Sequence, residues 1–144
     1  MTKLELTIMT ALLAGDRPEL AVLREQARQA TVRDRRYTGA GFFTHFVLPL
    51  DAPQLGDRFR LVLLDVGADL EQVKHGAGFV LFVVDGAIDC LEGYTYGDEQ
   101  WPAQASIRRW YYLRHPTPES PALVETMERD LDHALRHFRG LTRG

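Results

Sequence analysis

Cysteine, serine and lysine are scarce in this 144-residue chain. Cys90 is the only cysteine, so no disulfide can form within the chain, which is typical of a reducing compartment. The only serines are Ser106 and Ser120, and neither stands in the G-x-S-x-G motif of a serine nucleophile. All but Lys3 and Lys74 of the 17 basic residues are arginines, which favour bidentate ion pairs with carboxylates.

Long hydrophobic runs are also absent. The longest, residues 79–84, is far too short to cross a bilayer as a helix. Residues 8–15 could pass for a short signal segment, but Thr10 interrupts the run, so we interpret it as part of an amphipathic helix. We therefore expect a cytoplasmic protein without a membrane partner.

The composition is that of one ordinary globular domain. Hydrophobic residues make up 45% of the chain and charged residues 26%, with a net charge of −3. We expect a single α+β domain over residues 1–144. Leu4, Ile8 and Leu12 recur at helical spacing, and Asp16 with Glu19 predicts a capping box that starts a second helix running to about residue 30.

The middle of the chain changes to the alternating pattern of β-strands. The expected strands cover residues 31–37, 42–48, 58–66, 79–84, 87–95 and 107–113. Helices and strands do not alternate, which excludes a doubly wound parallel sheet. Beyond them, Leu123, Met127, Leu131, Leu135 and Phe138 form a helical stripe. The predicted fold is therefore α+β, with two N-terminal helices, a mainly antiparallel sheet of about six strands, and one long C-terminal helix.

The clearest local signal is a hairpin around residues 85–86, an Asp-Gly pair that suits a type I′ turn. With a two-residue turn and regular pairing, Leu81 faces Cys90 and Phe79 faces Glu92. Glu92 then lies on an apolar face, where a carboxylate must meet a cation, stay neutral or face a cavity. Two alternatives follow: a functional acid, or a structural acid paired with an arginine.

The hairpin leads into residues 94–102, which are dense in recognition chemistry. Aromatic side chains with a polar end are used by both protein interfaces and small-ligand clefts. With Glu92, the candidate binding residues are Tyr94, Tyr96, Asp98, Glu99 and Trp101. The alternative is a structured corner in which Trp101 fills the edge of the core.

Other motifs point away from cofactors and metals. The glycines at 76–78 precede a strand and lack the lysine of a phosphate-binding loop. His133 and His137 stand one helical turn apart, but without the glutamate of a metalloprotease helix. Residues 108–114 mix arginines and aromatics, yet a sequence pI near 5.9 disfavours nucleic acid as a partner. We expect no metal, no cofactor and no nucleic acid.

The hairpin sequence resembles that of a group of small bacterial proteins of unassigned function. The similarity is carried by Gly-Ala-Gly-Phe-Val-Leu-Phe at 76–82, Leu-Glu-Gly-Tyr-Thr-Tyr-Gly at 91–97 and Trp-Pro at 101–102. It implies a bacterial origin and no particular activity or site. The size and α+β layout also resemble those of bacterial immunity proteins at the level of the fold.

Together these features favour a non-catalytic binding or interaction protein, whose partner is another protein or a second copy of the chain in a homo-oligomer. The alternative is a small-ligand-binding protein or an enzyme that uses a buried carboxylate at Glu92. The sequence leans against an enzyme because it offers no recognisable nucleophile, catalytic pair or cofactor loop.

Overall fold

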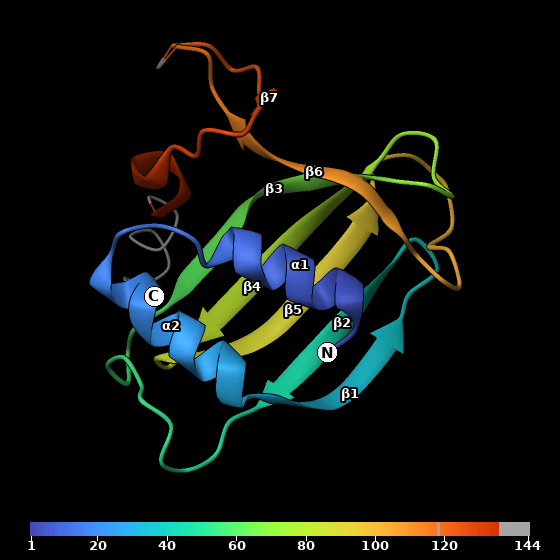
Figure 1. The fold of residues 1–144 in the computed structure, drawn as a ribbon. Coiled ribbons are helices and arrows are strands. Elements are labelled where there is room, and N and C mark those ends of the chain that lie inside the picture. The colour runs from blue at the N-terminus through green and yellow to red at the C-terminus, as the bar shows by residue number, and fades with distance from the viewer. Residues whose placement is uncertain (118, 136–144) are drawn as a thin grey trace.

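Two helices and a seven-stranded sheet make up the fold, in a computed structural model that describes residues 1–117 and 119–135 (Figure 1). The helices are α1 (Lys3–Leu12) and α2 (Pro18–Gln29), and the strands are β1 (Thr31–Tyr37), β2 (Gly41–Val47), β3 (Leu61–Leu70), β4 (Ala77–Val84), β5 (Ala87–Thr95), β6 (Ile107–Arg114) and β7 (Val124–Thr126). Their order in the sheet is β1-β2-β5-β4-β3-β6-β7, and every neighbouring pair is antiparallel. The predicted α+β class and antiparallel sheet are confirmed.

Both helices pack on the same face of the sheet, as Figure 1 shows. α1 lies against β3 and β4, and α2 lies against β5. The core between them is apolar, and its largest fully buried side chains include Ile8, Leu12, Leu23, Phe79 and Leu81. Within the described ranges, no helix of the chain covers the opposite face of the sheet.

The two helices begin differently. Thr2 is the N-cap of α1, and its side chain accepts from the Glu5 amide while the Glu5 carboxylate accepts from the Thr2 amide. The capping box predicted at Asp16 is wrong, because Arg17 is the N-cap of α2 and Pro18 occupies the first turn. Asp16 therefore lies one residue too early to cap this helix.

The hairpin turn has the predicted geometry. Asp85 and Gly86 adopt φ angles of 52° and 80°, the left-handed conformation that a type I′ turn requires. Gly86 lies beneath the loop that precedes β3, where its amide donates to the Phe59 carbonyl and its own carbonyl accepts from the Leu55 amide. The buried amide of Gln26 also donates to the Gly86 carbonyl, so the turn is fixed from two sides.

The pairing beyond the turn differs from the prediction. Asp89 is an extra residue in β5, because Val83 pairs with Ile88 whereas Phe82 pairs with Cys90. Side chains alternate between faces along a strand, so one extra residue moves every later side chain to the other face.

This bulge corrects the predicted surroundings of Glu92. Leu81 pairs with Leu91 and Phe79 pairs with Gly93, whereas Glu92 pairs with Val80. Glu92 therefore lies on the face away from the helices, and not beside Phe79 and Leu81. The bulge keeps the fully buried Leu91 on the core side.

The long C-terminal helix is a wrong prediction. In the described part of this region only residues 131–135 are helical, and Val124–Thr126 instead pairs with β6 as β7. Leu123 and Met127 are exposed, so they do not belong to a buried stripe. Phe138 and His137 lie outside the described residues. The free edge of β6 offers backbone hydrogen bonds to this segment, and β7 takes them up.

A buried ion pair fixes the segment after β7. Arg129 donates to both carboxylate oxygens of Asp65 in β3, at 2.9 and 2.8 Å, and both side chains are buried. Arg129 also donates to the Ala14 carbonyl just beyond α1, at 2.7 Å. The Tyr112 hydroxyl donates to the nearby Ala11 carbonyl. These contacts tie the C-terminal segment, β3 and the end of α1 together.

Candidate functional site

The sheet face that points away from α1 and α2, called the open face below, carries the residues that the hairpin leads to. Phe43 of β2 pairs with Glu92 of β5, which pairs with Val80 of β4, so these three side chains form one row across the sheet. Tyr94 and Phe82 flank this row on the same face. The side chains of the row and its flanks are all half-buried. A carboxylate therefore stands among apolar and aromatic neighbours.

Glu92 has no cationic partner in the part of the chain that the structure describes. In residues 1–117 and 119–135, no hydrogen bond or ion pair to its carboxylate is present, so the predicted structural alternative of a paired arginine finds no support there. Burial raises the pKa of Glu92 above its ordinary value of 4.5. The ionised carboxylate is therefore disfavoured in the isolated chain.

Apolar side chains around this row are exposed to solvent. Val47 at the end of β2 is 44% exposed, and Leu64 of β3 is 37% exposed. On an antiparallel sheet with one face buried, the other face normally carries polar side chains. The open face departs from that pattern, because its central strands present Val80 and Phe82. It has the aromatic and apolar composition of a binding surface.

Two tyrosines cover part of the open face over β3 and β4. Tyr94 lies over Gly78, where a Cβ atom would come within 2.6 Å of the Tyr94 hydroxyl oxygen. Tyr96 lies over Gly67 in the same way, and its hydroxyl forms a hydrogen bond with Tyr111. Burial is the main cause that raises the pKa of Tyr96. The glycines thus admit the two predicted tyrosines close to the sheet.

The loop acids of the predicted site behave differently from Glu92. Glu99 accepts from the backbone amides of Lys74 and His75, at 2.9 and 3.1 Å. The Lys74 amide is the main cause that lowers the pKa of Glu99. Asp98 is exposed. Glu99 therefore holds two loops together, and its carboxylate is already occupied.

Trp101 lies on the other side of the sheet. Its ring packs edge-on against Phe42 and Phe79, with centroid distances of 4.9 and 6.2 Å. Its backbone amide donates to the Gly39 carbonyl at 2.7 Å. The structure thus brings Glu92, Tyr94 and Tyr96 together on the open face and places Trp101 among side chains of the helix-covered face.

A second polar group lies on the open face, and the pairing that forms it was not predicted. His45 of β2 pairs with Asp34 of β1, and its Nδ1 lies 2.8 Å from an Asp34 carboxylate oxygen. On its other side His45 pairs with Cys90. Cys90, His45 and Asp34 are therefore neighbours on three adjacent strands, in the order of a cysteine–histidine–aspartate triad. The β1–β2 register was the only signal that could have revealed it.

The electrostatics of this row oppose nucleophilic catalysis. Burial, with smaller contributions from nearby acids, raises the pKa of Cys90 to about 11. A thiol with such a pKa is almost wholly protonated at neutral pH and is a poor nucleophile. Cys90 therefore acts as a small apolar residue of the sheet.

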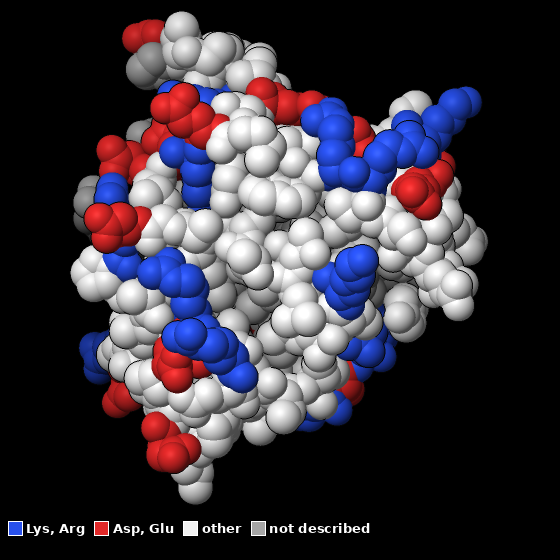
Figure 2. Space-filling view, viewed as in Figure 1, with Lys and Arg blue, Asp and Glu red and all other residues white. Residues whose placement is uncertain are grey.

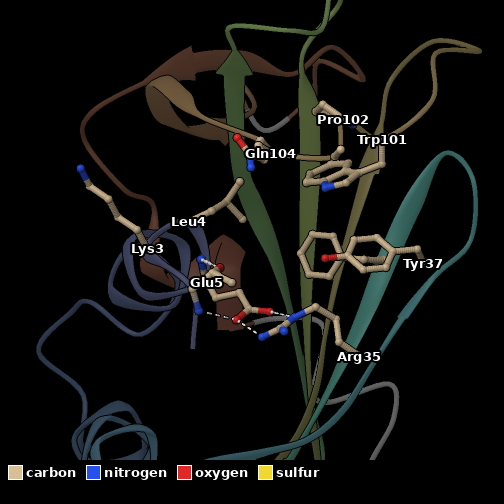
Figure 3. Close-up of a pocket in the computed structure, with 12 residues that line it drawn as sticks. Lys3, Leu4, Glu5, Arg35, Tyr37, Trp101, Pro102 and Gln104 are labelled. Carbon is tan, nitrogen blue, oxygen red and sulfur yellow. Dashed lines mark hydrogen bonds and ion pairs between the residues drawn. The ribbon is translucent and has the colours of Figure 1, made fainter.

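A cavity of about 280 Å³ on the helix-covered side also escaped prediction. It is lined by Glu5 of α1, Arg35 of β1 and Trp101, among others (Figure 3). Glu5 is 1% exposed and accepts two hydrogen bonds from Arg35, at 2.9 and 2.7 Å, and one from the Thr44 hydroxyl at 2.5 Å. Burial alone would raise the pKa of Glu5, but these hydrogen bonds outweigh it and lower the pKa below 4.5.

Comparisons with known proteins identify no family and no related structure for this chain. No protein-family model matches the chain, and no match was found among the curated proteins or the solved structures. Within the described residues, no cluster of three or more histidine, cysteine, aspartate or glutamate side chains could hold a metal ion. No helix there is long and apolar enough to cross a membrane.

Proposed function

We propose that this chain is a non-catalytic protein-binding module and that the open face of its sheet is the recognition surface. The observation that carries the proposal is Glu92: a half-buried carboxylate set between Phe43 and Val80, with no cationic partner among the described residues. The motif similarity to small bacterial proteins of unassigned function remains a prediction that accompanies this proposal.

The proposed occupant is another protein that presents an apolar surface with an arginine or lysine near its centre. An unpaired, partly desolvated carboxylate costs free energy in the isolated chain, and a cation from a partner offsets that cost. Phe43, Val80, Phe82 and Tyr94 supply the apolar area around it. Apolar side chains around one well-placed ion pair are the arrangement of an interface centre.

An acid–base or small-ligand role for Glu92 has less support. Glu92 does not line the cavity at the start of α1 or either of two further cavities beside that helix. The raised pKa of the neighbouring Cys90 keeps its thiol protonated at neutral pH, and the nearby His45 side chain already binds Asp34. The apolar and aromatic side chains around Glu92 have the composition of a surface that binds a macromolecular partner.

Quantitative copurification tests this function. The tagged wild-type chain, Glu92→Gln, Glu92→Arg and the control Glu71→Gln would be expressed in the cells that produce the protein, and bound proteins would be quantified by mass spectrometry. Glu71 is exposed and lies outside the open face. We expect one partner that Glu92→Gln retains at about a tenth or less of the wild-type amount, that Glu92→Arg loses, and that Glu71→Gln retains in full.

The other occupants give different results. Light scattering that shows a dimer lost in Glu92→Arg would assign the face to a second copy of the chain. A partner that binds all four proteins equally, or no partner and a monomer throughout, would contradict the proposal.

A further inference from the structure

The cavity at the start of α1 lies apart from the open face. It opens between that helix, the neighbouring ends of β1 and β2, and residues 101–105, on the helix-covered side of the sheet (Figure 3). Its apolar walls include Leu4, Phe42 and Trp101. Figure 2, which shows the same helix-covered side, has mixed acidic and basic side chains along its edges and a largely uncharged centre. The cavity is thus a small, mainly apolar site.

Glu5 is the only acid among the described residues that line the cavity. One of its carboxylate oxygens accepts from the Thr2 amide and from Arg35, and the other accepts from Arg35 and the Thr44 hydroxyl. Both oxygens therefore have two donors each, which fills their usual acceptor capacity. Glu5 offers a ligand no acceptor, and its contribution is to hold Arg35.

Arg35 has donors left over. Its Nε and Nη2 bind Glu5, whereas Nη1 has no partner within the described part of the chain. The Arg35 side chain is 26% exposed, so the guanidinium borders the cavity and is not sealed beneath it. Because Glu5 fixes its orientation, binding a carboxylate through Nη1 requires little further ordering of the side chain.

Three other polar side chains that line the cavity, those of Tyr37, Trp101 and Gln104, also have no hydrogen-bond partner in the described part of the chain. Among residues 1–117 and 119–135, nothing accepts from the indole Nε1 of Trp101 or pairs with the Tyr37 hydroxyl and the Gln104 side-chain amide. Figure 3 shows Arg35, Tyr37, Trp101 and Gln104 around one space. Hydrogen-bond donors therefore outnumber free acceptors, and aromatic rings form the walls.

We propose that this cavity binds a small carboxylate with a flat apolar body. The carboxylate accepts from Arg35, and the body packs against Trp101 and Phe42. Apolar walls with a few convergent donors are the usual construction of a small-ligand site. This inference does not depend on the proposed function, because the open face lies on the other side of the sheet.

Two matched probes test it on the wild-type chain. Benzoate and benzyl alcohol have the same ring, but only benzoate carries a charge that Arg35 would bind. In ¹H–¹⁵N NMR titrations, we expect benzoate to shift the Trp101 indole Nε1–H signal and to bind at least about tenfold more tightly than benzyl alcohol. Equal affinities for the two probes, or an unmoved Trp101 signal, would overturn the proposal.

Variants locate the site. Arg35→Met should remove the preference for benzoate, whereas Arg36→Met should preserve it, because Arg36 is the next residue of β1 and lies on the open face. Glu92→Gln should bind benzoate like the wild type. Should Arg35→Met fail to fold, the comparison of benzoate with benzyl alcohol on the wild-type chain still tests the proposal. Tyr37→Ala, at a 61% exposed position of the cavity wall, provides a second variant for the same comparison. Preserved preference in a folded Arg35→Met protein would contradict the assignment.

Discussion

Two glutamates show how the immediate surroundings decide what a carboxylate does in this protein. Glu5 is almost fully buried and receives hydrogen bonds from Arg35, Thr44 and Thr2, so it belongs to the structure of the folded chain. Glu92 is less buried and has no such donor in the described ranges. The pKa of Glu5 is lowered and that of Glu92 is raised.

The pKa of Glu92 leads to a prediction for the isolated chain. Because its folded-state pKa lies above 4.5, ionising Glu92 costs stability as the pH rises from 4.5 through the folded-state value. Glu92→Gln should therefore raise the free energy of unfolding at about pH 7 by roughly 0.5 kcal/mol and leave it unchanged at about pH 3. Urea unfolding at both pH values measures this. A Glu92→Gln protein that is less stable at neutral pH would instead assign Glu92 a structural role.

Glu5 gives the opposite pH dependence. The folded-state pKa of Glu5 lies below 4.5. Its contribution to stability is therefore complete above about pH 4.5 and is lost as the pH falls through the folded-state pKa. Glu5→Gln should lower the free energy of unfolding by about 2 kcal/mol or more at neutral pH, because Arg35 loses its ionised partner. The variant should lose less stability than the wild type on acidification to about pH 3. Parallel pH profiles of the two proteins would contradict this account.

At the scale of elements, the sequence predicted the turn of the β4–β5 hairpin but not the register in which its two strands pair. Asp85-Gly86 has a local chemical signal, since both residues tolerate positive φ. The bulge at Asp89 has no such signal, because it follows from which side chains the helices bury. Leu91 must face the core, and the sequence around it alternates equally well in either register. The face of Glu92 could therefore not be predicted locally.

Glycines at two turns provide a matched test of backbone fit. Gly86 and Gly39 have similar φ angles of 80° and 89°. A Cβ at Gly86 would overlap the Leu55 carbonyl oxygen, whereas one at Gly39 meets nothing within 4 Å. Gly39→Ala should cost about 1 kcal/mol through left-handed strain alone. Gly86→Ala should cost at least about 2 kcal/mol more, because the loop over the turn must move. Equal losses in thermal or urea unfolding would show that this loop yields freely.

The C-terminal region shows how a tertiary contact overrides periodicity. Leu123, Met127 and Leu131 have helical spacing, yet residues 124–126 join the sheet. Asp65, the buried acceptor for Arg129, lies 64 residues away in the sequence, so no local pattern could reveal this contact. The cavity at Glu5 escaped prediction for the same reason, because Glu5 and Arg35 meet only when α1 packs on the sheet.

At the scale of the whole molecule, the central feature is a sheet with helices on one face and apolar side chains on both. The predicted site residues are divided between these faces: Glu92, Tyr94 and Tyr96 lie on the open face, and Trp101 lies with the core. The chain therefore presents a broad surface on one side and a small cavity on the other. The central claim is that the open face docks another protein.

Site-specific photocrosslinking from the open face tests that claim most directly. A photoreactive residue would replace Val80 at the centre of the face, with the exposed Thr10 of α1 as the control position. We predict a crosslinked product from position 80, heavier than the monomer and different in mass from a dimer of the chain, that is absent from position 10 and lost when Glu92→Arg is added. A product that forms equally from both positions, or that persists in the Glu92→Arg protein, would contradict the account.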